Sequence, residues 1–170
     1  NDAVKKAHGE YLLFLNNDTK IKEPGALWEL MDCIQREKAG AVGARLLYGD
    51  LTIQHAGVVL GYGGIAGHAF EGMSQTEYEN LRYAKVIRQM SAVTAACMLV
   101  DRRAFEQIGG FTEELGVAYN DIDLCMKLRK AGWMILYDPA AQMYHYESQT
   151  RGFEMSTEKA ERVKREAEYF

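Results

Sequence analysis

Hydrophobic and polar positions along the chain predict strands alternating with helices. Largely apolar runs at residues 11–15, 41–47 and 95–100 have little helical periodicity, and each predicts a short buried strand. Between the first two runs, apolar residues recur at helical spacing from Pro24 to Lys38. Pro24 is typical of a helix start and Gly40 of a helix end, so this stretch predicts a helix.

The middle of the chain predicts shorter elements. Residues 52–60 and 86–93 have strand-like composition, residues 76–84 favour a short helix, and residues 102–108 favour another helix, ended by two glycines. The glycine-rich run 61–67 lacks the Lys-Ser/Thr of a P-loop and opens no clear helix. We interpret it as a flexible surface loop rather than a phosphate cradle.

The last third of the chain begins with a helix at Asp121 that runs to Gly132 and has one apolar face. A strand at residues 133–137, stopped by Asp138-Pro139, and another at 142–146 follow it. Charged residues from 156 to 170 predict a solvated terminal helix. We expect one domain over residues 1–170, with a core at 1–148 and a flexible segment plus terminal helix at 149–170.

Composition excludes several classes of protein. The net charge of −4 argues against nonspecific binding of nucleic acid, which needs a basic face. Cys33, Cys97 and Cys125 are odd in number and have no CxxC spacing, so we interpret them as free core thiols in a reducing compartment. No apolar run approaches the ~20 residues that span a bilayer, and no signal peptide is visible.

Candidate chemistry begins where the first strand ends, at Asn16-Asn17-Asp18. A carboxylate at this edge of a sheet suits a hard cation such as Mg²⁺ or Mn²⁺, which bridges to substrate phosphates. Asn16 and Asn17 offer hydrogen bonds to a ribose or a phosphate. Taken alone, the segment is more typical of an Asx-type turn after a strand.

A second set of motifs changes that balance. Gly109-Gly110-Phe111 is followed by Asn120-Asp121-Ile122-Asp123-Leu124-Cys125, by a helix to Gly132, and by Tyr144-His145-Tyr146-Glu147-Ser148. In this order the motifs resemble the catalytic half of family-2 glycosyltransferases, which have the GT-A fold. The resemblance covers residues 1–148. It implies an α/β three-layer sandwich with a central mixed, mostly parallel sheet.

The resemblance also implies roles for individual residues. Asn16-Asn17-Asp18 stands in place of the family's DXD motif, in which Asp18 would hold the metal and the motif the nucleotide diphosphate. Asp121 would be the catalytic base, and its alternative is a plain helix cap. Asp123 would be a cap or a salt-bridge partner.

Two further residues complete the expected site. His145 would complete the metal site or contact the diphosphate, and its alternative is a packed histidine. Arg151 would offer a bidentate phosphate contact. Asn16 and Asn120 depart from the acidic residues usual in the family, which lowers the charge available to a metal. His55 and His68 have no such context and are interpreted as surface or structural residues.

The implied activity is inverting transfer of a sugar from a nucleotide-diphosphate sugar to a hydroxyl of a glycan or lipid-linked acceptor, in cell-surface polysaccharide synthesis. The strand-helix-strand half that grips the nucleobase in this family does not precede Asp18 here. We therefore expect a fragment that is inactive by itself. We expect a cytoplasmic parent protein, with peripheral contact at the inner membrane face left open.

Two other functions remain open at this point. One is a non-catalytic nucleotide- or carbohydrate-binding fragment of the same fold. The other is a metal-dependent hydrolase that uses Asp18, Asp121 and His145, although no hydrolase signature such as HExxH is present.

Overall fold

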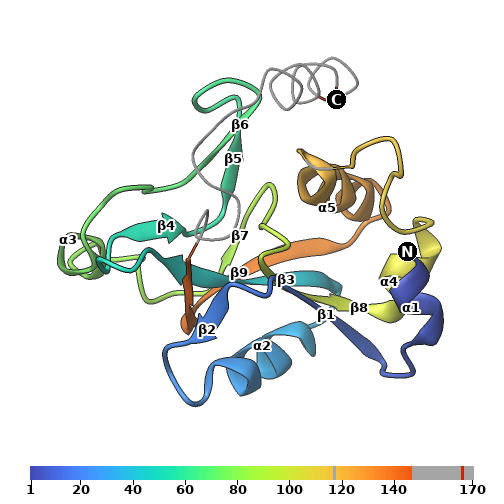
Figure 1. Cartoon of the computed structure of the whole chain (residues 1–170), viewed down its shortest axis with the longest axis horizontal. Helices are drawn as coiled ribbons and strands as arrows, with labels where there is room; N and C mark the ends of the chain where they lie inside the picture. The colour runs from blue at the N-terminus through green and yellow to red at the C-terminus, as the bar shows by residue number, and fades with distance from the viewer. Residues whose placement is uncertain (117, 147–165, 167–170) are drawn as a thin grey trace.

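A computed structural model of the chain describes residues 1–116, 118–146 and Glu166. Its main sheet contains β1 (Tyr11–Leu15), β2 (Thr19–Ile21), β3 (Ala39–Leu47), β4 (Ile53–His55), β7 (Arg88–Gln89), β8 (Cys97–Asp101) and β9 (Met134–His145). The strand order is β1-β8-β3-β9-β2, with β4 beside β3 and β7 beside β9 (Figure 1). β5 (Val58–Leu60) and β6 (Ala66–His68) form a separate hairpin.

Helices cover both faces of this sheet (Figure 1). The described helices are α1 (Asp2–Lys6), α2 (Ala26–Ile34), α3 (Gln75–Glu79), α4 (Arg102–Gln107) and α5 (Asn120–Lys130). The apolar side of α2 packs on one face in a core that includes Leu30 and Leu46. The helices α4 and α5 pack on the other face in a core that includes Phe105 and Leu128. The expected three-layer α/β arrangement is therefore confirmed.

The expectation of a mostly parallel sheet is wrong. Among the described strands only β3 and β9 pair in parallel, and β1–β8, β3–β8, β2–β9, β3–β4 and β7–β9 are all antiparallel. Parallel neighbours need long crossover connections, whereas antiparallel neighbours can follow a tight turn. The turn at Tyr48–Leu51, which joins the antiparallel strands β3 and β4, is a tight turn of this second kind. It is closed by a 3.0 Å hydrogen bond from the Leu51 N–H to the Tyr48 carbonyl.

The two strands expected at 133–137 and 142–146 are one continuous strand, β9. Asp138-Pro139 does not stop it. Instead the register along β3 jumps there, since Ala44 pairs with Asp138 but Arg45 pairs with Gln142. The Asp138 carboxylate accepts a 2.9 Å hydrogen bond from the Ala140 backbone N–H within the irregularity. A proline at a bulge costs no ladder hydrogen bond, which explains why the strand resumes.

Several helices and strands begin or end at other residues than the sequence predicts. The helix expected over 24–38 is α2, which is shorter, and Lys38 makes the following turn with φ = 61°. Gly40 lies inside β3, where a Cβ would lie 2.6 Å from the Trp133 Cβ. The strand expected at 86–93 shrinks to β7, and the strand run 52–60 splits into β4 and β5 around Gly57. The predicted strands at 11–15 and 41–47 are confirmed.

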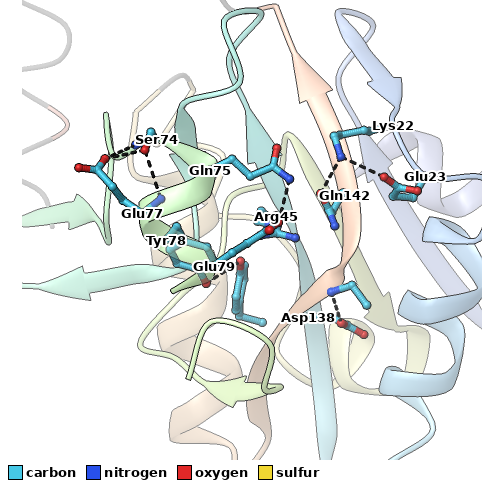
Figure 2. Close-up of polar contacts among 12 residues, drawn as sticks. Lys22, Glu23, Arg45, Ser74, Gln75, Glu77, Tyr78, Glu79, Asp138 and Gln142 are labelled. Carbon is cyan, nitrogen blue, oxygen red and sulfur yellow. Dashed lines mark hydrogen bonds and ion pairs between the residues drawn. The ribbon is translucent and has the colours of Figure 1, made fainter. Parts of the chain in front are cut away.

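Polar contacts join strands of the sheet to neighbouring segments of the chain (Figure 2). The Lys22 ammonium, just after β2, donates to the Gln142 side chain of β9 at 3.1 Å and pairs with Glu23 at 2.9 Å. On the other side, buried Arg45 of β3 lies 3.7 Å from the Glu79 carboxylate at the end of α3. The first of these contacts holds β2 against β9, beside the candidate site.

The three cysteines are free and buried, as expected. Burial in apolar surroundings raises the pKa of Cys33, Cys97 and Cys125 to about 12 in each case. These thiols are therefore neutral packing groups rather than nucleophiles. Within the described part of the chain, no helix has the length and apolar character needed to cross a membrane.

We predict that Gly43→Ala destabilises the fold. A Cβ on Gly43 would lie 2.4 Å from the Val93 Cβ across the core, and overpacking of this kind costs about 1–3 kcal/mol. Gly49→Ala is the matched control, because its Cβ would meet only the Tyr146 ring at 3.6 Å. Urea unfolding monitored by circular dichroism measures both free energies. Equal stability of the two variants would contradict the packing described at Gly43.

Candidate functional site

Asp18 and His145 are brought together by strand pairing. β1 ends at Leu15, the chain turns through Asn16-Asn17-Asp18, and β2 begins at Thr19, which pairs with His145 of β9. The Asp18 Oδ1 lies 3.2 Å from the His145 Nε2. Both side chains are largely buried, with 19% and 9% of their surfaces exposed. A strand-end carboxylate and a distant imidazole thus form one polar pair.

A hydrogen bond from Gln54 fixes the tautomer of His145. The His145 Nδ1 lies 2.7 Å from the Gln54 Oε1, and the Gln54 amide nitrogen donates to the His145 carbonyl at 3.3 Å. Because the amide oxygen accepts, Nδ1 carries the hydrogen. In the neutral ring Nε2 then holds a lone pair, which faces Asp18 and accepts from the Asn16 amide at 3.2 Å.

The geometry of this pair favours a cation. The Asp18 Oδ1 is buried and has no hydrogen-bond partner among the described residues, and its neighbour Nε2 is also an acceptor. Two buried acceptors in contact repel unless a proton or a metal ion lies between them. Neighbouring ligands of an octahedral ion are about 3.0 Å apart when each metal–oxygen bond is about 2.1 Å. The observed 3.2 Å fits that separation.

Asp18 and His145 are therefore the residues that could hold a metal. Within the described residues, no group of three or more His, Cys, Asp or Glu side chains could do so. A Mg²⁺ or Mn²⁺ ion commonly takes only one or two protein ligands and completes its shell with phosphates and water. The donor set fits that kind of site, with Gln54 as the group that orients the imidazole.

Asp121 lies in the first turn of α5, where it accepts two backbone hydrogen bonds. Its Oδ2 accepts from the Ala95 N–H at 3.1 Å and its Oδ1 from the Ile122 N–H at 2.9 Å. The cap position is Tyr119, with φ = 59° and no capping hydrogen bond from its side chain. Asp121 therefore bonds one backbone N–H of its own helix, as a capping residue does, and one outside it.

Asp123 forms a separate structural contact near Asp121. Its Oδ2 accepts from the Thr112 hydroxyl at 2.6 Å and lies 3.8 Å from the Lys127 ammonium. The expectation that Asp123 is a salt-bridge partner is therefore confirmed.

Backbone at Ala95 and Ala96 joins the two parts of the candidate site. The Ala95 N–H donates to Asp121, and the carbonyl of the next residue, Ala96, accepts from the Asn16 N–H at 3.0 Å. Consecutive residues are about 3.8 Å apart along the chain. The Asp18 turn and the first turn of α5 are therefore held side by side.

The other predicted site residues are placed as follows. Asn16 contacts His145 through its amide, and its carbonyl accepts from the Thr19 hydroxyl at 2.7 Å. Asn17 is exposed in the same turn. Arg151 lies outside the described residues, as does the predicted segment 149–170 apart from Glu166.

Sequence reasoning missed a histidine pair beside this site. His55 is fully buried, and its Nδ1 lies 2.7 Å from the Nδ1 of half-buried His68. Burial first, and then the nearby His68 and His145 rings, hold the pKa of His55 well below its ordinary value. The two rings and His145 line one polar cavity of about 70 Å³, together with Glu71 and Thr94. The available signal was a histidine inside an apolar strand, where a polar group needs a partner.

Solved structures with a similar fold are glycosyltransferases of the GT-A type. GalNAc-T7, crystallised with UDP, GalNAc and Mn²⁺, matches 98% of this chain and 33% of its own, with a TM-score of 0.69 and 13% identity. The mannosyltransferase PcManGT from Pyrobaculum calidifontis, in complex with GDP-Man and Mn²⁺, matches 89% of this chain and 36% of its own. Its TM-score is 0.58, with 15% identity. These matches establish the GT-A fold.

Sequence comparison defines the family. Residues 1–166 match the family described as glycosyltransferase like family 2, and the chain belongs to it. The protein y4gI of Sinorhizobium fredii is 43% identical over 99% of this chain, and the O-antigen biosynthesis protein RfbC of Myxococcus xanthus is 40% identical over 89%. An N-acetylglucosaminyl-diphospho-decaprenol L-rhamnosyltransferase of Mycobacterium tuberculosis is 30% identical over 89%. The chain spans 19%, 12% and 52% of these three relatives.

We predict that in Gln54→Leu the imidazole of His145 is no longer held in the Nδ1–H tautomer. Leucine removes the acceptor at 2.7 Å from Nδ1, and a buried donor left without a partner costs about 1–3 kcal/mol. The Nδ1–H form then loses its advantage over the Nε2–H form. Gln54→Glu keeps an acceptor at this place and is the control. Ring ¹⁵N chemical shifts of His145 report the tautomer, and identical shifts in wild type and Gln54→Leu would refute the assignment.

Proposed function

We propose that the chain is the acceptor-side and metal-binding part of a glycosyltransferase that moves a sugar from a nucleotide-diphosphate donor to a hydroxyl, with inversion. The observation that carries the proposal is the 3.2 Å Asp18–His145 pair, joined through Ala95 and Ala96 to Asp121. Membership of glycosyltransferase like family 2 supports it. In the proposal, the Asp18–His145 pair holds the cation and Asp121 is the base, and their shared link to Ala95 and Ala96 supports a common site.

The proposed cofactor is Mg²⁺ or Mn²⁺, and it would be held by Asp18 and His145. When bound, the ion supplies positive charge to the leaving diphosphate. The Asn16 amide contacts the ring of His145, and Asn17 is exposed in the same turn. Both side chains are proposed to form hydrogen bonds with the ribose or the phosphates of the donor. Arg151 is proposed as a further phosphate contact. The Mn²⁺ in both solved glycosyltransferases supports divalent metal use.

Asp121 is the proposed base that takes the proton of the attacking hydroxyl. Its carboxylate is anchored by the Ala95 and Ile122 N–H groups. These two donors hold the carboxylate in one orientation in the first turn of α5. The carboxylate keeps a further lone pair on each oxygen, so it can accept the substrate hydrogen while remaining anchored.

The proposed donor is a nucleotide sugar, as supported by UDP and GDP-Man in the two similar structures. The proposed acceptor is a glycan or lipid-linked sugar of the cell surface. The names of RfbC and of the decaprenol-linked rhamnosyltransferase support that acceptor class. We propose a cytoplasmic protein that meets such acceptors at the inner face of the membrane.

The proposed function is tested with the full-length protein, purified and incubated with UDP-, GDP- and TDP-sugars in the presence of Mn²⁺. Release of the nucleoside diphosphate that depends on an added acceptor supports glycosyl transfer. The anomeric configuration of the product, read by NMR, tests inversion. Binding of nucleotide sugars without any turnover would favour a non-catalytic binding domain, and release of free sugar alone would favour a hydrolase.

We expect Asp18→Ala to lower metal-dependent turnover of the full-length protein by about 10²-fold or more, because the metal site provides several kcal/mol of charge stabilisation. Asp32→Ala is the matched control, since Asp32 is an exposed carboxylate on α2. Initial rates over a Mn²⁺ titration measure the effect. Turnover in Asp18→Ala equal to that in Asp32→Ala would exclude Asp18 as a ligand.

Asp121→Asn should nearly abolish transfer while nucleoside-diphosphate binding persists. The amide oxygen can still accept from Ala95 at the anchored position, but it cannot take a proton. Loss of a general base typically lowers the rate by ~10²–10⁴. The control is Asp123→Asn in the same turn, which disturbs the Thr112 contact and leaves the base in place. Rates combined with calorimetric UDP or GDP binding separate the two roles, and near-normal transfer in Asp121→Asn would disprove the assignment.

A further inference from the structure

The β5–β6 hairpin brings His68 next to Asp121. β6 pairs with β5 so that His68 lies opposite Val58, and the Val58 N–H donates to the Ala92 carbonyl at 2.8 Å, which ties the hairpin to the rest of the chain. A small recess between the hairpin and α5 is lined by Val58, Ala66, Gly67, His68, Asp121 and Ile122. Among the described residues that line it, His68 and Asp121 are the two with hydrogen-bonding side-chain groups.

Contacts of His55 determine which nitrogen of His68 carries hydrogen. Two Nδ1 atoms 2.7 Å apart must share one hydrogen. The His55 Nε2 faces the Thr94 N–H at 3.5 Å and is therefore an acceptor, so in the neutral ring the hydrogen of His55 is on Nδ1. His55 then donates and His68 accepts. A neutral His68 consequently carries its own hydrogen on Nε2.

Burial of His55 supports the neutral state that this assignment needs. Its ring is fully buried, and that burial, with the neighbouring His68 and His145, holds its pKa well below the ordinary value. A charged His55 would have to donate toward the Thr94 N–H, which is itself a donor. The direction of the His55–His68 hydrogen bond is thus set by a backbone group that does not titrate.

The recess has a volume of about 60 Å³, which is enough for a water-sized group such as a hydroxyl. A hydroxyl entering it would meet the Asp121 carboxylate, which accepts, and the His68 Nε2–H, which donates. A hydroxyl is both a donor and an acceptor, so it matches this pair of partners.

We infer that His68 is a substrate-contacting residue, which donates a hydrogen bond from Nε2 to a sugar hydroxyl in the recess beside Asp121, and that buried His55 is the residue that positions it. The inference rests on the proposed glycosyl transfer. His68 also lines the cavity that contains His145, so it lies between the metal-holding pair and the base. The hydroxyl can belong to the transferred sugar or to the acceptor, and the experiment distinguishes these sources.

The test compares His68→Phe, which removes the donor, with His68→Gln, which restores an N–H on a flexible side chain. Val59→Ala is the hairpin control, because Val59 is 40% exposed on β5 and absent from the recess. The full-length protein is assayed with whichever UDP-, GDP- or TDP-sugar it turns over. We expect His68→Phe to lower kcat/KM for transfer by about 10–100-fold, the scale of one lost hydrogen bond in a buried site. His68→Gln should recover most of that loss, and UDP or GDP affinity should not change.

Two assays identify the source of the hydroxyl. If it belongs to the transferred sugar, His68→Phe slows donor hydrolysis without acceptor as much as it slows transfer. If it belongs to the acceptor, hydrolysis is unchanged and the KM for acceptor rises. Unchanged transfer in His68→Phe, or an equal loss in His68→Phe and His68→Gln, would overturn the inference.

A measurement on the chain itself does not depend on activity. Ring ¹⁵N shifts should show His68 as the Nε2–H tautomer in wild type and a mixture of tautomers in His55→Phe. An Nδ1–H tautomer of His68 in the wild-type chain would overturn the assignment even if every variant folds poorly. Failure of the proposed function is distinguishable, because the wild type would then turn over no nucleotide sugar while the His68 tautomer stayed as assigned.

Discussion

The arrangement of the site depends on three consecutive residues, Thr94, Ala95 and Ala96, that precede β8. Because these residues lie outside the strand, their backbone groups are free to bind side chains and loops. The Thr94 N–H donates to His55, the Ala95 N–H to Asp121, and the Ala96 carbonyl accepts from Asn16. Buried backbone groups must find partners, so this segment holds a β4 side chain, the start of α5 and the end of β1 in one place.

Next to this segment two buried acceptor atoms, the Asp18 Oδ1 and the His145 Nε2, lie 3.2 Å apart. In the part of the chain that the structure describes, the Asp18 Oδ1 has no hydrogen-bond donor, and Gln54 turns the lone pair of His145 toward it. A sequence selected for stability alone would place a donor there, because an unsatisfied buried acceptor is costly. Proteins keep such local violations mainly at functional sites. Gln54 thus does more than pack, since it prevents the simplest relief, an Nε2–H bond from His145 to Asp18.

Local patterns predicted the strands at 11–15 and 41–47, since largely apolar runs depend little on context. Strand direction, the continuity of β9 and the ends of α2 were missed because long-range pairing decides them. Asp18 was singled out by its place at a strand end, and Asp121 and His145 through a family resemblance. Asp18 and His145 meet because β2 pairs with β9, whereas Asp121 is placed by its bond to the Ala95 N–H. No local signal joins His55 to His68, since a thirteen-residue separation becomes a contact only after the hairpin has formed.

The glycine-rich stretch acquires a structural explanation from that hairpin. Gly57 has φ = 98°, which lets the chain leave β4 and start β5, and its carbonyl accepts from the Ala69 N–H at 2.9 Å. Gly67 leaves room for the Tyr62 carbonyl, which would lie 2.6 Å from a Cβ. Between these two glycines the chain returns close enough to β4 that the Nδ1 atoms of His55 and His68 lie 2.7 Å apart. The conformation of Gly57 and the close approach at Gly67 are thus requirements of the hairpin. The hairpin in turn places His68 in the recess beside Asp121 and in contact with His55.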